Sequence, residues 1–410
     1  MLYYSTANPN QRASLYEVIS RGVPADGGFY MPERLPYIPS AFFRNMADMS
    51  LKDIGFIVIN TLFGEDMDSA ELKAIVADAI NFDTPLTPDP CHKDMYALEL
   101  FHGPSKSYKD FGARFMANIL RRLHKPTGNI DIVVATTGDA GEAVARSFYG
   151  LPGTRVFIVY PRSGTGLKQL SAFASLGGNI IPVEVRGTFA QCHDMVRAVV
   201  ADAAIETRIP LLAANSFNLG RLLPQTIYYF YAYARLLQAG ADTSRITIAV
   251  PSGNLGNLTA GLIAMRMGLP AKRIIAVRSD GPDVYHHYVN RGIRPGRAES
   301  RDVPPNFRRI VDLYGDCPDD LRADSGSVVL DPAEVKAATG NLALDPVVAA
   351  ARAALASPDI EATARVYLAT TSADKDIAAA GRQSFHPAVT LPPSPTLFRN
   401  FIRSYKPAHS

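Results

Sequence analysis

Apolar and polar residues follow two distinct patterns along the chain, and the change falls near residue 95. Before it, apolar residues such as Leu15, Val18 and Ile19 recur at helical spacing, which favours amphipathic helices. Beyond it, short β-branched runs alternate with helical stretches. Alternation of strands and helices predicts parallel sheets with helices on their faces, an α/β fold.

Seven runs in the second part are predicted strands. Some are continuously apolar, as at Val156–Val159, which is typical of strands buried on both faces of a sheet. The predicted strands are Tyr96–Leu100, Ile130–Thr136, Arg155–Tyr160, Ile180–Val185, Ile246–Val250, Arg273–Arg278 and Ala364–Thr370. Helices are expected near 110–123, 140–149, 167–176, 188–203, 219–238, 257–267, 332–339 and 345–356.

Other segments fall outside this alternation. Residues 1–90 read as mainly helical after an extended start, and their helix at Asp68–Ile80 has Ser69 as the expected cap. The prolines of Phe82–Pro90 indicate a linker. Residues 281–327 are rich in Arg, Pro, Asp and Gly, and we expect an irregular insertion there.

Composition and charge narrow the classes of function. The 42 basic and 39 acidic residues leave a net charge of +3, which gives no electrostatic reason to expect a nucleic acid or a membrane surface as partner. Cys91, Cys192 and Cys317 lie far apart without a CxxC, so we expect no disulfide framework, no metal site and a reducing, cytoplasmic compartment. Neither a membrane span nor a signal peptide is predicted.

A lysine begins the first helix of the α/β part. The strand that ends at Leu100 runs into a Gly-Pro turn, and Lys109 then stands at the start of the helix. The positive end of the helix dipole disfavours the charged amine there, and partial burial acts in the same direction. A neutral amine suits Schiff-base chemistry. The alternative is a solvated lysine in a first helical turn.

Two further turns offer backbone N–H groups to anions. The turn from Thr136 to Ala140 opens a helix and suits a substrate carboxylate, unless it is an ordinary turn capped by Asp139. The glycines of Ser252–Asn257 let N–H groups converge on a phosphate. That loop lacks both the P-loop and the complete GxGxxG pattern, which disfavours ATP and NAD. A phosphate loop, an anion turn and a helix-start lysine together favour pyridoxal phosphate as cofactor.

Ordered motifs run along nearly the whole chain. They are Tyr3–Thr6, Gly27–Pro32, Leu98–Pro104, Tyr108–Gly112, Phe148–Leu151, Leu176–Ile180, Asn215–Leu223 and Pro251–Leu262. In this order they resemble the threonine synthase family of fold-type II pyridoxal-phosphate enzymes. The resemblance implies a tryptophan synthase β-like α/β fold with two lobes and the cofactor between them. It also implies a helical N-terminal extension at 1–90, a catalytic core at 91–410 and a smaller, mobile lobe at about 112–205.

The resemblance assigns site residues by their position in these motifs. Lys109 matches the Schiff-base lysine, Asp139 lies near the cofactor's phenolic oxygen, and Thr370 faces its pyridine nitrogen. The residues that match the phosphate-binding loop are Gly253, Asn254, Leu255, Gly256 and Asn257. The residues that match substrate-binding positions are Thr136, Thr137, Gly138, Ala140, Asn218 and Arg221.

Four segments depart from the family's usual sequence. Ala140 stands where a hydroxyl is usual, and Ser163–Gly166 replaces a Gly-Lys-x-Ser that helps to bind the substrate phosphate. The usual Thr-Ala-His-Pro reads Thr-Thr-Ser-Ala from Thr370, and the residues before Lys109 also differ. Loss of a cation from a phosphate pocket costs about 1.5–3 kcal/mol. Lys106 or Lys168 could restore that charge.

The resemblance implies a lyase that converts O-phosphohomoserine and water into threonine and phosphate by γ-elimination and β-addition. Its substrate is then a small, phosphorylated amino acid, and its place is amino-acid biosynthesis. The departures leave open a paralogue that uses the same chemistry on another activated amino acid or with another nucleophile. A third hypothesis is a non-catalytic sensor that binds pyridoxal phosphate. The retained Lys109 disfavours it, because a protein that only binds the cofactor does not need a Schiff-base amine. We expect a monomer or a homodimer.

Overall fold

The computed structural model describes residues 1–123, 130–165, 167–206, 211–279, 281, 284–292, 303–315, 318–340, 342–372 and 386–406. These residues pack into two compact units, each assembled from segments that are distant in the sequence. Unit 1 comprises residues 1–33, 109–221 and 374–410, and unit 2 comprises 34–108 and 222–373. The segment 1–90, predicted as an extension, therefore contributes to both units.

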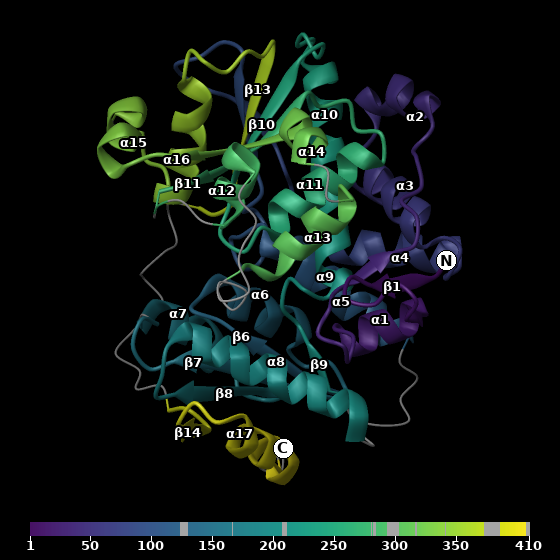
Figure 1. Cartoon of the computed structure of the whole chain (residues 1–410), viewed down its shortest axis with the longest axis vertical. Coiled ribbons are helices and arrows are strands. Elements are labelled where there is room, and N and C mark those ends of the chain that lie inside the picture. The colour runs from purple at the N-terminus through teal and green to yellow at the C-terminus, as the bar shows by residue number, and fades with distance from the viewer. Residues whose placement is uncertain are drawn as a thin grey trace. The chain divides into compact units, whose positions relative to one another are not determined.

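Unit 1 consists of an α/β part with one main sheet and of a small antiparallel sheet (Figure 1). Its elements are β1 (Tyr3–Ser5), β2 (Arg12–Ala13), α1 (Leu15–Arg21), β3 (Tyr30–Pro32), α5 (Lys109–Leu123), β6 (Ile130–Ala135), α6 (Asp139–Phe148), β7 (Thr154–Pro161), α7 (Leu167–Ala174), β8 (Ile180–Val185), α8 (Phe189–Glu206), β9 (Leu211–Ala213), α9 (Leu219–Leu222, whose last residue belongs to unit 2), β14 (Val389–Leu391) and α17 (Pro395–Ser404).

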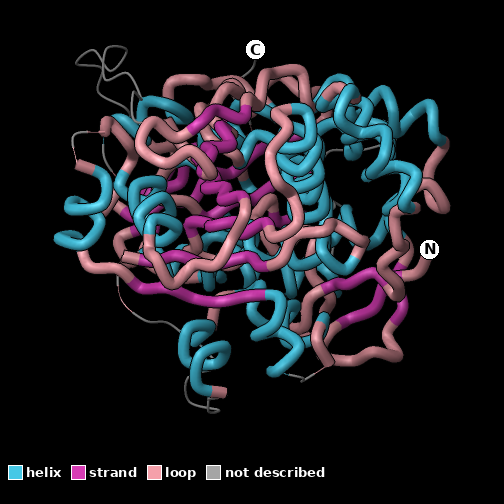
Figure 2. The backbone as a smooth tube through the Cα atoms, turned by 90° about the horizontal axis from the view of Figure 1, so that it is seen from above, coloured by secondary structure: helices cyan, strands magenta, loops and turns pink. Residues whose placement is uncertain are grey.

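The main sheet of unit 1 has the order β14-β8-β7-β6-β9, and all its pairs are parallel. Val133 and Phe157 of its central strands are fully buried in a core that also includes Val196 of α8 and Phe398 of α17. Apolar strands buried on both faces account for this packing. The antiparallel strands β2-β1-β3 form a second sheet beside the N-terminus (Figure 2).

Unit 2 contains the longer sheet and most of the helices. Its elements are α2 (Ser40–Asn45), the 3₁₀ helix η1 (Met46–Asp48), α3 (Leu51–Phe63), α4 (Ser69–Ala79), β4 (Leu86–Pro88), β5 (Met95–Glu99), η2 (Leu223–Gln225), α10 (Thr226–Gln238), β10 (Ile246–Pro251), α11 (Gly256–Arg266), β11 (Arg273–Arg278), α12 (Val284–Arg291), α13 (Pro305–Leu313), α14 (Pro318–Asp324), β12 (Ser325–Val329), α15 (Pro332–Thr339), α16 (Pro346–Ala356) and β13 (Ala364–Ala369).

The sheet of unit 2 has the order β12-β11-β10-β13-β5-β4. All its pairs are parallel except that of β4 with β5. Residues of α16 such as Val348 and Leu355 pack against Ile275 and Tyr367 of the sheet. The strand–helix alternation predicted seven of the parallel strands, whose boundaries shift by one or two residues, but it missed the parallel strands β9, β12 and β14.

Four sequence predictions of local structure are wrong in detail. Residues 281–327 contain α12, α13, α14 and β12 rather than only irregular chain, because helices of seven to nine residues fit between the Pro and Gly positions that suggested a loop. The expected linker contains β4, which pairs at the sheet edge. Asp68, not Ser69, caps α4, because its carboxylate accepts from the N–H groups of Ala70 and Glu71. Helix α6 begins at Asp139, with Gly138 as its cap.

None of the helices placed by the structure combines the length and apolar character needed to cross a membrane. Among the same residues, no group of three or more His, Cys, Asp or Glu side chains is arranged to hold a metal ion.

Candidate active site

Three neighbouring strands of unit 2 bring predicted site segments to one edge of the sheet. Strands β10, β13 and β5 are adjacent and parallel. Ser252–Asn257 follows β10, Thr370 follows β13, and the segment that leads to Lys109 follows β5. Ligands of open α/β sheets bind at the carboxyl ends of the strands, so topology gives these segments a common location.

The Ser252–Asn257 loop is held from one side by donors that lie far away in the sequence. Arg278, the last residue of β11, donates from Nη1 to the carbonyl oxygens of Ser252 and Gly253, each at 3.4 Å. Asn306 of α13 donates from Nδ2 to the carbonyl oxygen of Asn254 at 3.1 Å. Three successive carbonyl groups of the loop thus have donors from other elements.

The opposite side of the loop is suited to an anion. In a trans peptide the N–H points away from the C=O, so the N–H groups of Gly253, Asn254 and Leu255 point away from these donors. A Cβ placed on Gly253 would meet no atom within 4 Å, which leaves space for a ligand. Within the described residues, Ser252 Oγ and Asn257 Nδ2 are buried and have no hydrogen-bond partner.

These features fit the phosphate of pyridoxal phosphate. Leu255 has φ +62° and precedes α11, where the first N–H groups of the helix lack intrahelical acceptors. A non-glycine residue in the left-handed region is costly and is often kept at a functional turn. The amides, the two unpartnered polar atoms and the open space beside Gly253 match a ligand that only accepts hydrogen bonds.

A buried arginine lies behind the loop. Arg309 of α13 is fully buried and donates from Nη1 to Asn306 Oδ1 at 2.8 Å. Burial lowers the pKa of Arg309 to about 9, against the opposing effect of Asp312, so the guanidinium is charged at neutral pH. Through Asn306 this charge polarises the bond to the Asn254 carbonyl. The arrangement places positive charge behind an anion-binding loop.

The segment before Lys109 is fixed to the strand end at Thr370. The N–H of Tyr108 donates to the Thr370 carbonyl oxygen at 2.9 Å, and Ser107 pairs with Thr371 in an antiparallel bridge. The N–H of Ser372 donates to the carbonyl oxygen of Lys106 at 3.4 Å. Lys106 has φ +50°, so both described non-glycine residues with positive φ, Lys106 and Leu255, lie in predicted site segments.

In unit 1, Lys109 is the first residue of α5 and its backbone is tightly packed. A Cβ on Gly112 would lie 2.3 Å from the carbonyl oxygen of Arg221, so only glycine allows this approach. The buried Arg221 side chain donates to the carbonyl oxygens of Ala214 at 2.6 Å and Lys109 at 3.5 Å. These contacts give the start of α5 one position against the segment after β9.

The Lys109 side chain faces the second predicted turn. Its Nζ lies 4.0 Å from Oδ2 of Asp139, and the two side chains are 28% and 30% exposed. Thr136 organises the turn itself, because its Oγ1 accepts from the N–H groups of Gly138 and Gly141 at 2.9 Å and donates to the Gly138 carbonyl oxygen at 3.0 Å. At this separation the amine and the carboxylate form a partly exposed ion pair.

Asn218 and Asn215 support this side of unit 1. Asn218 is fully buried, donates to the carbonyl oxygens of Ile19 and Ala213, and accepts from the N–H of Gly220. Asn215 bonds both backbone groups of Ala135, the last residue of β6. The Asn218 amide therefore orders the backbone, and its predicted contact with substrate stays a prediction.

The remaining substrate-binding predictions lie around the same turn. Thr137 is exposed, whereas Gly138 and Ala140 are partly exposed. The side chain of Lys168, in the first turn of α7, lies outside the described residues. Of the altered segment after β7, Gly166 is also outside them, and the Thr165 hydroxyl is buried without a partner in the described residues.

Sequence reasoning missed Arg278, Asn306, Arg309 and the tyrosines that contact Asn257. Arg278 ends a predicted strand, but nothing in its spacing indicates that it reaches back to Ser252. Asn306 and Arg309 are three residues apart and share a helix face, yet they fall in the segment expected to be irregular. No local pattern marks them as supports of a loop that lies 52 residues earlier in the chain.

Most of the chain matches two known families. Residues 81–371 match the family described as pyridoxal-phosphate dependent enzyme, and residues 2–80 match the family described as threonine synthase N terminus. Among curated proteins, the chain is similar to the threonine synthase of Haemophilus influenzae. The two are 35% identical over 344 residues, which cover 82% of this chain and 79% of that protein.

Comparison with solved structures also finds threonine synthases. The chain is similar to the crystal structure of threonine synthase from Escherichia coli, with a TM-score of 0.87 and 28% identity over 99% of this chain and 100% of that one. It shares its fold with a structure described as pyridoxal-phosphate-bound threonine synthase from Brucella melitensis. That TM-score is 0.81 at 23% identity, and the match covers 98% of this chain and 99% of the other.

Proposed function

The chain belongs to the threonine synthase family of pyridoxal-phosphate dependent enzymes, and we propose that it converts O-phosphohomoserine and water into threonine and phosphate. In this reaction the Cγ–O bond breaks and phosphate leaves. Cβ loses a proton and gains the hydroxyl of water, while Cγ gains a proton and becomes a methyl group. When bound, pyridoxal phosphate supplies the electron sink for the charge that develops at Cα and Cβ.

The pair formed by Lys109 and Asp139 is the observation that carries the proposal. Lys109 begins α5, and its Nζ lies 4.0 Å from the Asp139 carboxylate at the start of α6. We assign Lys109 the removal of the Cα proton and the return of protons to the product. Asp139 stabilises the protonated amine between these two tasks by Coulomb attraction.

The two turns have different tasks in the proposal. Ser252–Asn257 holds the cofactor's phosphate through the amides that point away from Arg278 and Asn306. The turn from Thr136 to Ala140 holds the substrate carboxylate at the start of α6. Thr370, which follows β13, faces the pyridine nitrogen with a hydroxyl, which does not protonate that nitrogen as an acid would.

Lys106 is our candidate for the cation that binds the substrate's phosphate. It is exposed and lies in the segment whose backbone bonds Thr370 and Ser372. Its backbone has the left-handed conformation, with φ +50°, which is costly for a lysine. Such strain is often kept where function requires it. An ammonium acts on phosphate as a point charge. The comparisons give no support to a different activated amino acid as substrate.

The test is to supply purified enzyme with O-phosphohomoserine and to measure released phosphate and the amino-acid product. We expect equal amounts of phosphate and threonine. Homoserine as the product would show hydrolysis of the ester instead. If there is no turnover while pyridoxal phosphate is bound, other activated amino acids become the substrates to examine.

A further inference from the structure

A buried pair of tyrosines contacts the side chain of Asn257. Tyr228 and Tyr229 follow each other on α10, are fully buried, and have ring centroids 5.0 Å apart. The Tyr228 hydroxyl donates to Asn257 Oδ1 at 2.5 Å, and the Tyr229 hydroxyl is 2.8 Å from the same atom. Tyr229 also donates to the backbone carbonyl oxygen of Asn257 at 2.8 Å.

These distances define which end of the Asn257 amide faces the tyrosines. A separation of 2.5 Å lies in the range of O–H···O bonds and is too short for N–H···O bonds. Oδ1 is therefore the atom that faces the hydroxyls, and Nδ2 points away from them. Asn257 is 3% exposed, and its Nδ2 has no partner among the described residues. A buried amide donor without an acceptor is costly.

Both hydroxyls remain donors throughout the neutral range. Burial is the main cause that raises the pKa of Tyr228 and of Tyr229 well above the ordinary value, and Tyr108 acts in the same direction on both. A protonated hydroxyl cannot turn into an anion that would repel a phosphate. The pair can therefore hold one orientation of the amide throughout the neutral range.

We propose that Tyr228 and Tyr229 are positioning residues that orient Asn257 so that its Nδ2 donates to the phosphate of pyridoxal phosphate. The inference rests on the proposed role of the Ser252–Asn257 loop and adds the elements that fix its last residue. The two tyrosine hydroxyls donate to Oδ1 of the Asn257 amide, and the phosphate accepts from its Nδ2. The cofactor then completes a hydrogen-bond network that the protein alone leaves open.

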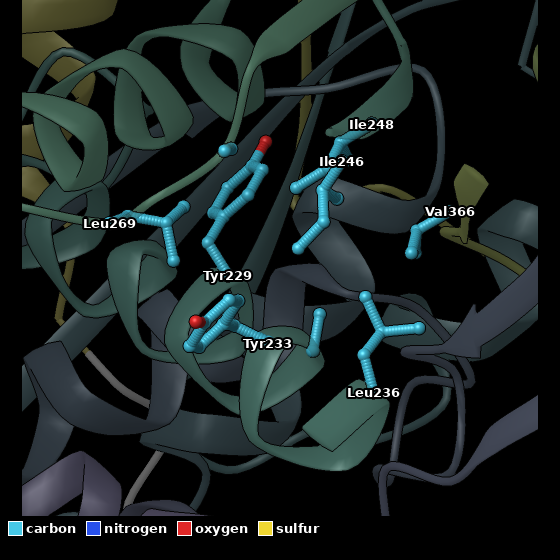
Figure 3. A pocket seen from close by; sticks show the side chains of 9 residues that line it. Tyr229, Tyr233, Leu236, Ile246, Ile248, Leu269 and Val366 are labelled. Atoms are coloured by element: carbon cyan, nitrogen blue, oxygen red, sulfur yellow. The ribbon is translucent and has the colours of Figure 1, made fainter. Parts of the chain in front are cut away.

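Tyr233, one turn along α10, offers a matched control. Figure 3 shows a small apolar cavity lined by Tyr229, Tyr233 and aliphatic side chains such as Leu236 and Val366, with the two hydroxyls pointing in different directions. The cavity lacks the polar donors that a phosphate needs, so it is no part of the cofactor site. Tyr233→Phe removes a hydroxyl from the same helix without removing one from Asn257.

The experiment compares Tyr228→Phe, Tyr229→Phe, the double variant and Tyr233→Phe with the wild type. Each apoprotein is titrated with pyridoxal phosphate by absorbance, and the phosphorus NMR shift of the bound cofactor is recorded. We expect each single variant to weaken binding about threefold, because one hydroxyl still holds Oδ1, and the double variant to weaken it about 30-fold or more. The phosphorus shift should move in the double variant only.

Unchanged affinity and an unchanged phosphorus shift in the double variant, with the cofactor bound by the wild type, would overturn the inference. An equal loss in Tyr233→Phe would also overturn it, since that loss would reflect packing of α10. If the wild type failed to bind pyridoxal phosphate, the proposed function itself would be wrong. Asn257→Leu, which keeps the size of the side chain, should reproduce the double variant's loss of affinity.

Discussion

The two turns that follow β6 and β10 look alike in sequence but are held in different ways. The turn from Thr136 is fixed by one of its own residues, whose hydroxyl makes three hydrogen bonds within five residues. The Ser252–Asn257 loop is fixed from outside, by Arg278, Asn306 and two tyrosines of α10. A locally fixed turn can be recognised from sequence, whereas a loop fixed from a distance depends on residues that no local pattern reveals.

The difference suits the ligands that we assign to the two turns. A resident cofactor needs a loop that keeps its amides in place without the ligand, and support from three other elements provides that. A substrate arrives and leaves in each cycle, and a turn that depends on one hydroxyl can adjust around it. Changes to remote residues should therefore affect the cofactor, and changes to local residues should affect the substrate.

The largest effect is expected for Lys109→Ala. Turnover should fall at least about 10³-fold, because the variant loses the general base, worth about 10²–10⁴-fold, and the amine that attaches the cofactor. Borohydride reduction of the wild type followed by peptide mapping should place the cofactor on Lys109. A label on Lys106 instead would contradict the assignment.

Gly253→Val should weaken cofactor binding without changing the stability of the fold. A Cβ at this position meets no protein atom within 4 Å, so the apoprotein should melt at the wild-type temperature. The added side chain would occupy the space where we place the phosphate. We expect affinity for pyridoxal phosphate to fall about 100-fold, or about 2.7 kcal/mol, in a titration. Full affinity would make the loop an ordinary turn.

Much of this architecture could be predicted from the sequence because its signals are local. Apolar β-branched runs predicted seven strands but not β9, β12 or β14, and glycines after strands predicted the two turns and the helix start at Lys109. The supports of the second loop could not be predicted in this way. Asn306 lies 52 residues from Asn254, and Tyr228 appears only as another apolar residue of a buried helix. Long-range hydrogen bonds leave no periodic trace in a single sequence.

Thr136→Val and Thr259→Val compare the two turns directly. Each removes one buried hydroxyl and keeps the shape of the side chain. Thr136 accepts two N–H bonds, whereas Thr259 only donates one bond to the Leu255 carbonyl oxygen. Loss of Thr136 should lower the free energy of unfolding by about 1–3 kcal/mol, and loss of Thr259 by about 1 kcal/mol. Equal losses in denaturant titrations would contradict the local fixation of the first turn.

Lys106→Ala tests the proposed contact with the substrate's phosphate. We expect KM for O-phosphohomoserine to rise about tenfold, with a smaller change in kcat and an intact cofactor spectrum, because uniform binding is lost. Lys168→Ala is the parallel variant for the segment after β7. If neither variant changes the kinetics with the phosphate ester, no lysine has replaced the missing cation.

The smallest expected effect is on the stability of the fold at acidic pH. His193 of α8 packs edge-on against Phe217, which lies two residues beyond Asn215 in the sequence. Burial lowers its pKa below 6.5, helped by Arg197 and opposed by Asp194. The unfolded chain therefore binds this proton more readily, and stability is lost as pH falls below about 6.5.

His193→Gln should flatten this dependence by about 1.4 kcal/mol for each unit by which the pKa is lowered. The check is denaturant unfolding of the wild type and the variant at pH 7.5 and pH 5. If both proteins lose the same stability on acidification, then the acid sensitivity does not come from His193.

The most direct test of the proposed activity is the reaction of O-phosphohomoserine in water labelled with ¹⁸O. Elimination of phosphate followed by addition of water at Cβ places the label in the hydroxyl of threonine and none in the phosphate. Mass spectrometry of both products reads this out in one sample. Label in the phosphate, with homoserine as the other product, would show attack of water at phosphorus and would contradict the account.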